Sequence, residues 1–196
     1  MKLYDISQEV FSCCIFPGDP KSEKKTVASM AEGSLYNLTA LSMCAHNGTH
    51  VDAPFHFVND GKTVDQLDLE VFVGACYVAR QKGNLSAPDA EDILRRANGA
   101  RRILIAGQAT VTAEAAAVFA DANILLLGNE NQSVGPENAP MQVHLILLKK
   151  GVALLEGVVL TAVPEGQYFL SAAPLNLAGA DGAPCRAYLI KREENI

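Results

Sequence analysis

The sequence predicts an α/β protein in a single domain, 1–196, built around a mixed sheet. The length of 196 residues allows one domain with a substantial core and is short for two. The middle of the chain alternates short apolar runs with helical patterns, as strands and crossover helices do. Both ends are rich in strand-like runs, which we expect to add a further sheet layer.

The first part of the chain holds fewer clear signals than the middle. A first strand is expected at 1–10, followed by a turn at 16–20, where two prolines and a glycine favour reversal. Residues 21–33 are polar and contain no strong signal. Polar and apolar residues roughly alternate over 36–45, which predicts a half-buried strand. A further apolar strand is expected at 71–79.

Three helices are expected in the second part of the chain. The first covers 86–97, because Ser86 and Asp89 form an N-terminal capping pair with a proline in the first turn. The second covers the alanine-rich stretch 112–122, and the third covers 138–150, with a glycine after its end. Strands are expected at 101–106, 124–127, 152–155, 168–170 and 185–190, with a turn-rich stretch at 179–182.

Composition excludes several classes of protein. Hydrophobic residues make up 49% and charged residues 19% of the chain, which is typical of a compact globular protein. The net charge of -6 repels phosphate backbones, so we expect no nucleic-acid partner. No apolar run approaches the roughly 18 residues that span a bilayer, so we expect no membrane partner. Five cysteines without a C-x-x-C pair, and a start without an apolar leader, indicate free thiols in a reducing cytoplasm.

The histidines are the most informative residues, because three of the four lie in one short segment together with a carboxylate. This segment contains His46, His50, Asp52 and His56. Imidazoles and a carboxylate are ligands that a borderline divalent metal such as zinc selects. A straight strand would spread the four side chains over roughly 33 Å, so the segment must bend, and Gly48 and Pro54 allow or force such bends.

Two residues further along the chain can complete this centre. His144 lies on the third expected helix, and Glu156 follows an apolar strand. Taken alone, His144 would be interpreted as a core histidine and Glu156 as a surface or salt-bridge residue. A closed structural zinc site would more often use cysteines, whereas an open site of three or four ligands with water is catalytic.

Together these residues resemble the signature of the cyclase family, which includes bacterial kynurenine formamidases and isatin hydrolases. The resemblance extends along most of the chain. The matching segments are His46-x-Gly48-Thr49-His50-x-Asp52-x-Pro54-x-His56, Pro17-Gly18-Asp19, Gln132-Ser133-Val134 with His144, Leu154-Leu155-Glu156, Pro174-Leu175-x-Leu177 and Gly179-Ala180-Asp181-Gly182-x-Pro184-x-Arg186.

The resemblance implies a layered β/β/α fold of the swivelling-domain type and a hydrolase that uses Zn²⁺, as one ion or two, or Mn²⁺. It also implies a small-molecule amide substrate and assembly as a homodimer or homotetramer. The implied metal ligands are His46, His50, Asp52, His144 and Glu156. His56 would act as the proton donor and acceptor in catalysis.

One position departs from the family pattern. Kynurenine formamidases usually carry tryptophan just before the P-G-D turn, where this chain has Phe16, and the chain contains no tryptophan. We expect Phe16 to contact the substrate by stacking, with a different surface from that of tryptophan. This puts N-formylkynurenine itself in doubt as the substrate and leaves the hydrolytic chemistry intact.

The expected activity is therefore hydrolysis of a small amide C–N bond, with an aryl formamide as the first substrate class. A cyclic amide of the isatin type is the alternative. A metal-binding or small-ligand-binding protein without catalysis is a hypothesis of a different kind. A purely structural metal, or a scaffold that forms oligomers, is a further one.

Overall fold

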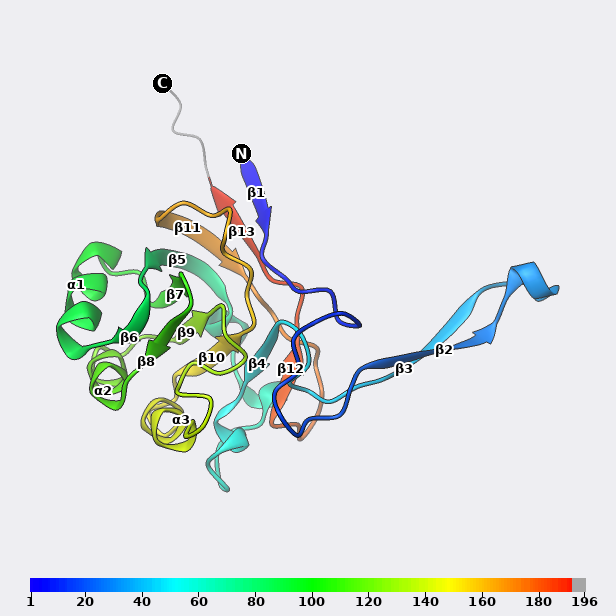
Figure 1. Ribbon diagram of the computed structural model, residues 1–196, viewed down its shortest axis with the longest axis horizontal. Helices are drawn as coiled ribbons and strands as arrows, with labels where there is room; N and C mark the ends of the chain where they lie inside the picture. The colour runs from blue at the N-terminus through cyan, green and yellow to red at the C-terminus, as the bar shows by residue number, and fades with distance from the viewer. Residues whose placement is uncertain (192–196) are drawn as a thin grey trace.

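A nine-stranded mixed sheet forms the body of the protein, and the computed structural model describes residues 1–191 (Figure 1). The strand order is β1-β13-β11-β5-β7-β9-β10-β4-β12. The bounds are β1 (Lys2–Asp5), β4 (His50–Asp52), β5 (Val73–Arg80), β7 (Arg102–Ala106), β9 (Leu126–Asn129), β10 (Ala153–Glu156), β11 (Gly166–Ser171), β12 (Gly182–Pro184) and β13 (Tyr188–Lys191). The central strands β5, β7, β9 and β10 run parallel, and the outer strands pair antiparallel. The mixed sheet is confirmed.

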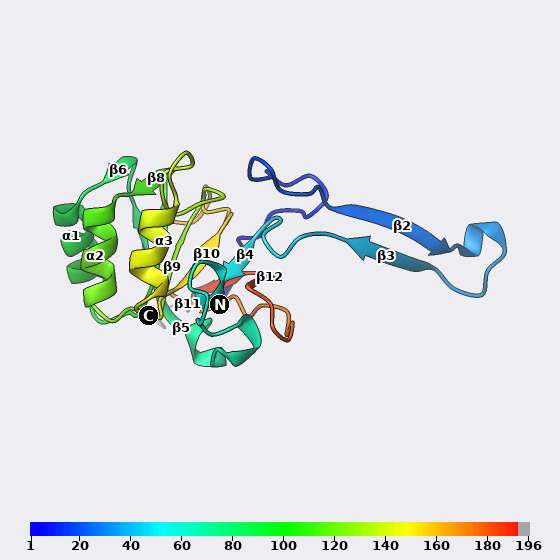
Figure 2. The same cartoon turned by 90° about the horizontal axis from the view of Figure 1, so that it is seen from below.

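Three α-helices lie side by side on one face of this sheet (Figure 2). They are α1 (Ala87–Ala97), α2 (Ala113–Asp121) and α3 (Met141–Leu148). The capping box that predicts the first helix is present, because Ser86 accepts from the Asp89 backbone and Asp89 accepts from the Ser86 N–H at 2.9 Å. Helix α3 begins after Pro140, three residues later than expected.

Both faces of the central strands are buried, which explains their nearly continuous apolar sequences. On β7, Ile103 and Ile105 point toward the helices, whereas Leu104 points to a second apolar cluster on the other face. This second cluster also contains Val51 of β4 and Leu189 of β13, from opposite ends of the strand order. The sheet therefore curls over itself. The strands from the two ends of the chain provide the second β layer as parts of one sheet.

Shorter elements complete the body. A parallel pair is formed by β6 (Gly83–Leu85) and β8 (Ala109–Val111). The short 3₁₀ helices are η1 (Met30–Glu32), η2 (Pro54–His56), η3 (Val64–Gln66) and η4 (Leu69–Val71). None of the helices within residues 1–191 combines the length and apolar character needed to cross a bilayer.

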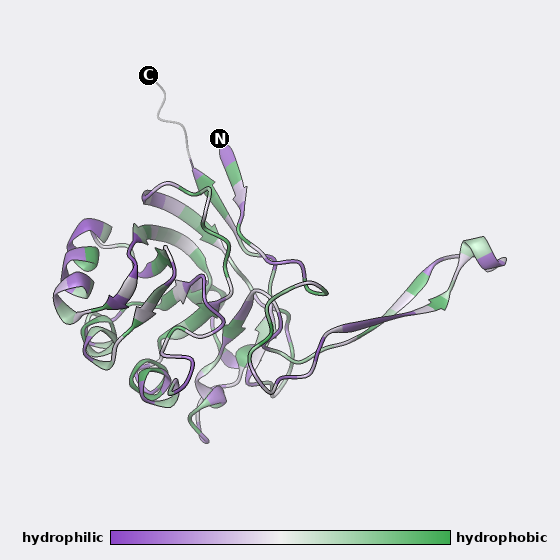
Figure 3. Cartoon of the chain, viewed as in Figure 1, coloured by the Kyte–Doolittle hydropathy of each residue, from purple (hydrophilic) through white to green (hydrophobic). Residues whose placement is uncertain are grey.

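A two-stranded antiparallel hairpin, here called the arm, projects from the body (Figure 1). It consists of β2 (Glu23–Ala28) and β3 (Leu38–Ser42), joined by η1. The polar segment 21–33, which contains no strong sequence signal, thus includes the strand β2. The expectation of a half-buried strand over 36–45 was wrong about burial, because every residue of β3 is exposed. Alternation of polar and apolar residues does not specify that a second layer covers the apolar side. Figure 3 shows apolar stretches on the arm as well as in the central strands.

Two further differences concern short segments. The strand expected at 124–127 is shifted in the structure, because β9 covers Leu126–Asn129 and therefore includes Gly128. A side chain there would meet Leu104 and the Leu155 carbonyl at 2.7 Å, so glycine permits close strand packing. The turn-rich stretch near 179–182 ends in β12, a short strand that pairs with β4.

Candidate metal centre and active site

Strand β4 carries the centre of the predicted site, between β10 and β12. His50 and Asp52 lie two residues apart and face the same side, as the spacing predicts for an extended segment. The antiparallel register sets His50 opposite Glu156 of β10. All three residues are buried, with at most 3% of the surface of each exposed. Pairing of two strands far apart in sequence therefore brings the two carboxylates to one place.

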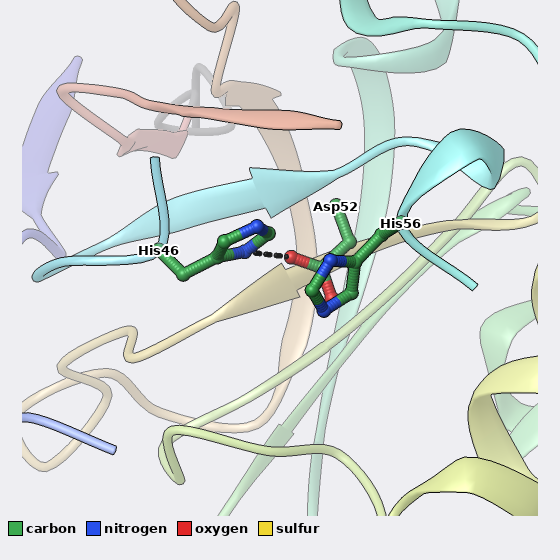
Figure 4. A group of neighbouring side chains, drawn as sticks. All are labelled: His46, Asp52 and His56. Atoms are coloured by element: carbon green, nitrogen blue, oxygen red, sulfur yellow. Dashed lines mark hydrogen bonds and ion pairs between the residues drawn. The ribbon is translucent and has the colours of Figure 1, made fainter. Parts of the chain in front are cut away.

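The expected bends on either side of β4 are present. Gly48 has a φ of 69°, a conformation that glycine adopts without strain, and it lies in the turn between His46 and His50. Pro54 begins the short helix η2, which ends at His56. These two bends direct the imidazoles of His46 and His56 toward Asp52. Figure 4 shows the three side chains converging.

Asp52 lies at the middle of the cluster. Its Oδ1 lies 2.8 Å from His46 Nδ1 and 3.4 Å from His50 Nε2, and its Oδ2 lies 3.6 Å from His144 Nε2. Glu156 closes the far side, with Oε2 at 3.5 Å from His50 Nε2 and Oε1 at 3.2 Å from His144 Nε2. The five residues predicted as metal ligands therefore form one contiguous group.

Backbone contacts fix the orientation of two imidazoles. His50 donates from Nδ1 to the Gly48 carbonyl at 3.0 Å, and His144 donates from Nδ1 to the Pro140 carbonyl at 2.9 Å. In both residues Nε2 is thereby left to face the carboxylates. A metal-ligating histidine is usually held in this way through its other nitrogen. Glu156 is held in turn by the Val134 N–H at 2.8 Å.

The electrostatics of the cluster follow from buried charges of opposite sign. Burial alone would lower the pKa of His46, but the hydrogen bond to Asp52 raises it to about 9. Burial likewise opposes a charged His50, and Asp52 with Glu156 raises its pKa well above the ordinary value. Burial would raise the pKa of Asp52, whereas the two imidazoles hold it well below its usual range. The site therefore strongly favours a cation next to its carboxylates.

Two observations test whether a divalent ion fits these residues. Asp52 Oδ2 is buried and accepts no hydrogen bond from any residue in the described part of the chain. A buried carboxylate oxygen without a partner is costly unless a cation satisfies it. Two sets of donor atoms, each within 4.8 Å of one another, share Asp52: one adds His46 and His56, and the other adds His50 and Glu156. The donor set fits a divalent metal.

A cavity of about 210 Å³ opens next to the cluster. The cavity is lined by His56, predicted for proton transfer, and by Phe16, predicted for substrate contact. Phe57 adds a second aromatic wall, with its ring 4.6 Å from that of His144 and tilted by 34°. Sequence reasoning did not single out Phe57, although it directly follows His56.

Asp181 is the other residue that sequence reasoning left without a role. Its Oδ2 accepts from His46 Nε2 at 2.8 Å and from His56 Nδ1 at 3.1 Å. The residue belongs to the Gly179-Ala180-Asp181-Gly182 run that contributes to the family resemblance. A lone aspartate in a glycine-rich turn could have indicated a site, but nothing local connects it to histidines 125 and 135 residues away.

Comparisons with known proteins agree with this geometry. A family model described as "Putative cyclase" matches residues 4–136, about two thirds of the chain. A kynurenine formamidase from Erythrobacter litoralis (strain HTCC2594) is 33% identical over 96% of this chain and 93% of its own. A kynurenine formamidase from Bacillus anthracis is 34% identical over 96% of this chain and 97% of its own. The matches to these relatives thus extend beyond the family model, into the part of the chain that holds His144 and Glu156.

Solved structures share the fold. A structure described as a potential metal-dependent hydrolase with cyclase activity is 27% identical, with a TM-score of 0.80, over 98% of this chain and 99% of the other. An isatin hydrolase bound to the product analogue thioisatinate has a TM-score of 0.85 at 18% identity, over 98% and 93%, which supports the layered α/β fold alone. The chain belongs to the cyclase family of hydrolases.

Proposed function

We propose that this hydrolase cleaves the C–N bond of a small amide, with an aryl formamide as its first substrate class. The observation that carries the proposal is the buried cluster around Asp52, which opens into a cavity with aromatic walls. The curated relatives are kynurenine formamidases, and one similar fold is an isatin hydrolase. A cyclic amide is therefore the second candidate substrate class.

We propose that His46, His50, Asp52, His144 and Glu156 hold the metal, as one ion or two. Zn²⁺ is the first candidate, because borderline imidazole ligands outnumber the carboxylates, and Mn²⁺ is the second. When bound, such an ion polarises a substrate carbonyl and makes water more acidic. The residues themselves supply the buried negative charge that retains a cation and the oriented Nε2 atoms that ligate it.

Two residues of the cavity would act on the substrate directly. His56 lies beside the cluster but remains partly exposed to the cavity, with 26% of its side chain accessible. Such a position suits a group that exchanges protons with a leaving nitrogen. Phe16 and Phe57 offer apolar faces on which a planar ring of the substrate can stack. Hydrolysis of an aryl formamide would add one water across the C–N bond and release formate and an arylamine, with His56 taking a proton from that water and passing it to the leaving nitrogen.

Parallel measurements of metal content and turnover test the proposal. The purified protein would be analysed for bound metal and assayed with formanilides, isatin and cyclic imides. Turnover of formanilides that is lost on chelation and restored by Zn²⁺ or Mn²⁺ supports it. Turnover of isatin alone favours the cyclic-amide alternative. Bound metal without turnover of any amide favours the binding-protein hypothesis, and unfolding on chelation without any amide turnover favours a structural metal.

We also propose that the protein assembles as a homodimer or homotetramer through the arm. Six large apolar side chains are exposed on the arm: Val27, Met30, Leu35, Tyr36, Leu38 and Leu41. A lone two-stranded hairpin is marginally stable in water, and exposed apolar clusters mark interaction sites. Light scattering would test this with the double variant Leu38→Lys/Leu41→Lys, which should shift the mass toward a monomer, and with Glu23→Lys as a control on the same arm. A native protein that is monomeric at all concentrations overturns it.

Two further expectations are kept as proposals. We propose that residues 1–196 form one domain, which limited proteolysis would test through the absence of separable fragments. A cytoplasmic location is supported by the five cysteines, all of which are free thiols. Cell fractionation would test it.

A further inference from the structure

Asp181 lies at the end of the loop before β12, against the segment that carries the histidines. Its backbone carbonyl accepts from the Ala53 N–H at 2.9 Å, next to Asp52. The following residue, Gly182, has no room for a side chain, because a Cβ there would lie 2.5 Å from the Val51 carbonyl and 2.9 Å from His46 Cε1. The loop therefore approaches the imidazoles as closely as its backbone allows.

The side chain of Asp181 contacts two imidazoles with one oxygen. Oδ2 accepts from His46 Nε2 at 2.8 Å and from His56 Nδ1 at 3.1 Å. The two rings lie 4.0 Å apart between centroids and are tilted by 33°. One carboxylate therefore joins a residue of the metal cluster to the residue proposed for proton transfer.

Hydrogen-bonding chemistry sets the consequence of this arrangement. An ionised carboxylate can only accept, and a neutral imidazole carries a single N–H. An imidazole that donates to Asp181 must therefore present its other nitrogen without a proton. For His46 that nitrogen is Nδ1, and the neutral form applies once a bound cation replaces the proton that Nδ1 donates to Asp52 in the metal-free protein. For His56 it is Nε2, the nitrogen that remains to exchange a proton with the substrate.

The loop does not need this side chain to keep its place. The Val64 N–H donates to the Ala180 carbonyl at 2.9 Å, and the Gly179 N–H donates to Asp65 Oδ1 at 2.9 Å. With the bond from Ala53, these contacts anchor three successive residues without the Asp181 carboxylate. Its two bonds to imidazoles therefore act on the rings and not on the loop.

We propose that Asp181 is a positioning residue that selects the tautomer and orientation of both His46 and His56. The role rests on the proposed function, since it assigns His56 to proton transfer. A carboxylate that orients a histidine in this way typically contributes 10–100-fold to metal affinity or activity. Asp181 would orient His46, a proposed metal ligand, and His56, the proposed proton-transfer group, at the same time.

Two substitutions separate this role from filling space. Asp181→Leu keeps a similar size and removes both acceptors, whereas Asp181→Asn keeps one acceptor oxygen without the charge. Asp65→Leu serves as the matched control, because it removes a side-chain contact to the same loop without touching an imidazole.

The first measurement is the ¹⁵N spectrum of the histidine rings in the zinc-loaded protein, which is tractable because the chain has four histidines. Native protein and Asp65→Leu should both show His56 protonated at Nδ1. In Asp181→Leu the proton should shift to Nε2 or distribute over both nitrogens. An unchanged tautomer in Asp181→Leu overturns the proposal, and this result does not depend on any activity.

The second measurement is steady-state hydrolysis of the best amide at saturating zinc. The value of kcat should fall about 10–100-fold in Asp181→Leu, with an unchanged KM and full metal content. The kcat of Asp181→Asn should lie between those of Asp181→Leu and the native protein, and the kcat of Asp65→Leu should equal the native value. Native activity in both the Leu and the Asn variant would indicate that the side chain only fills space, and it would overturn the proposal. Absence of any turnover by the native protein would instead overturn the proposed function, and the ring spectra would still decide the tautomer.

Discussion

Replacement of Asp52 by asparagine should abolish the stabilisation of this protein by a divalent metal. Asp52 is fully buried and belongs to both sets of donor atoms, so the substitution removes a charged ligand from each. A ligand that binds only the folded state at 100 times its Kd stabilises it by about 2.7 kcal/mol. For a chain of this length, each kcal/mol shifts Tm by about 2–4 °C. On metal binding, the Tm of the native protein should therefore rise by about 5–11 °C, and the Tm of Asp52→Asn should hardly change.

The assay compares thermal unfolding by circular dichroism after dialysis against a chelator, with and without added Zn²⁺. Each variant serves as its own reference, so any effect of the substitution on the metal-free protein cancels. Asp65→Asn is the control, because this exposed aspartate lies outside the cluster. An equal rise in Tm for native protein and Asp52→Asn would refute the assignment of Asp52 as the shared ligand. A native protein that does not respond to any divalent ion would refute the metal centre.

Three further predictions concern catalysis, stability and pH. His56→Ala should retain its metal while kcat/KM falls about 100–10,000-fold, the usual contribution of a general acid or base, and full activity in this variant would eliminate the role. Phe119→Ala should lower the free energy of unfolding in urea by about 3–5 kcal/mol, because this side chain is fully buried between α2 and the sheet; a loss well below that range would contradict the packing. Metal-stripped protein should lose stability as pH rises from 6.5 to about 9, because folded His46 keeps a proton that the unfolded chain releases above 6.5. A flat urea-unfolding profile over that interval would contradict the raised pKa.

The helices and central strands could be predicted because their signals are local. Ser86 and Asp89 lie within one turn of each other, so the start of α1 is encoded in four consecutive residues. Leu104 and its neighbours form a short apolar run, which predicts a strand buried on both faces. The chemistry of the motif was equally local, since bends at Gly48 and Pro54 suffice to gather its side chains.

The arm illustrates why burial was harder to predict. Polar and apolar residues roughly alternate over 36–45, which predicts a half-buried strand, yet Leu38 and Leu41 are both exposed. Periodicity reports the conformation of a segment and not the presence of a layer above it. Whether an apolar side chain is buried depends on elements elsewhere in the chain, or on a second molecule.

By itself, the sequence determined the kind of chemistry this protein performs, because imidazoles and a carboxylate at this spacing select a metal wherever the segment bends to gather them. Only the tertiary structure decided that Glu156 lies opposite His50 and that Asp181 joins His46 to His56. Those contacts connect residues more than 100 positions apart. They form because the sheet register and the approach of the loop at Gly182 bring the segments together, and no local pattern encodes such an approach.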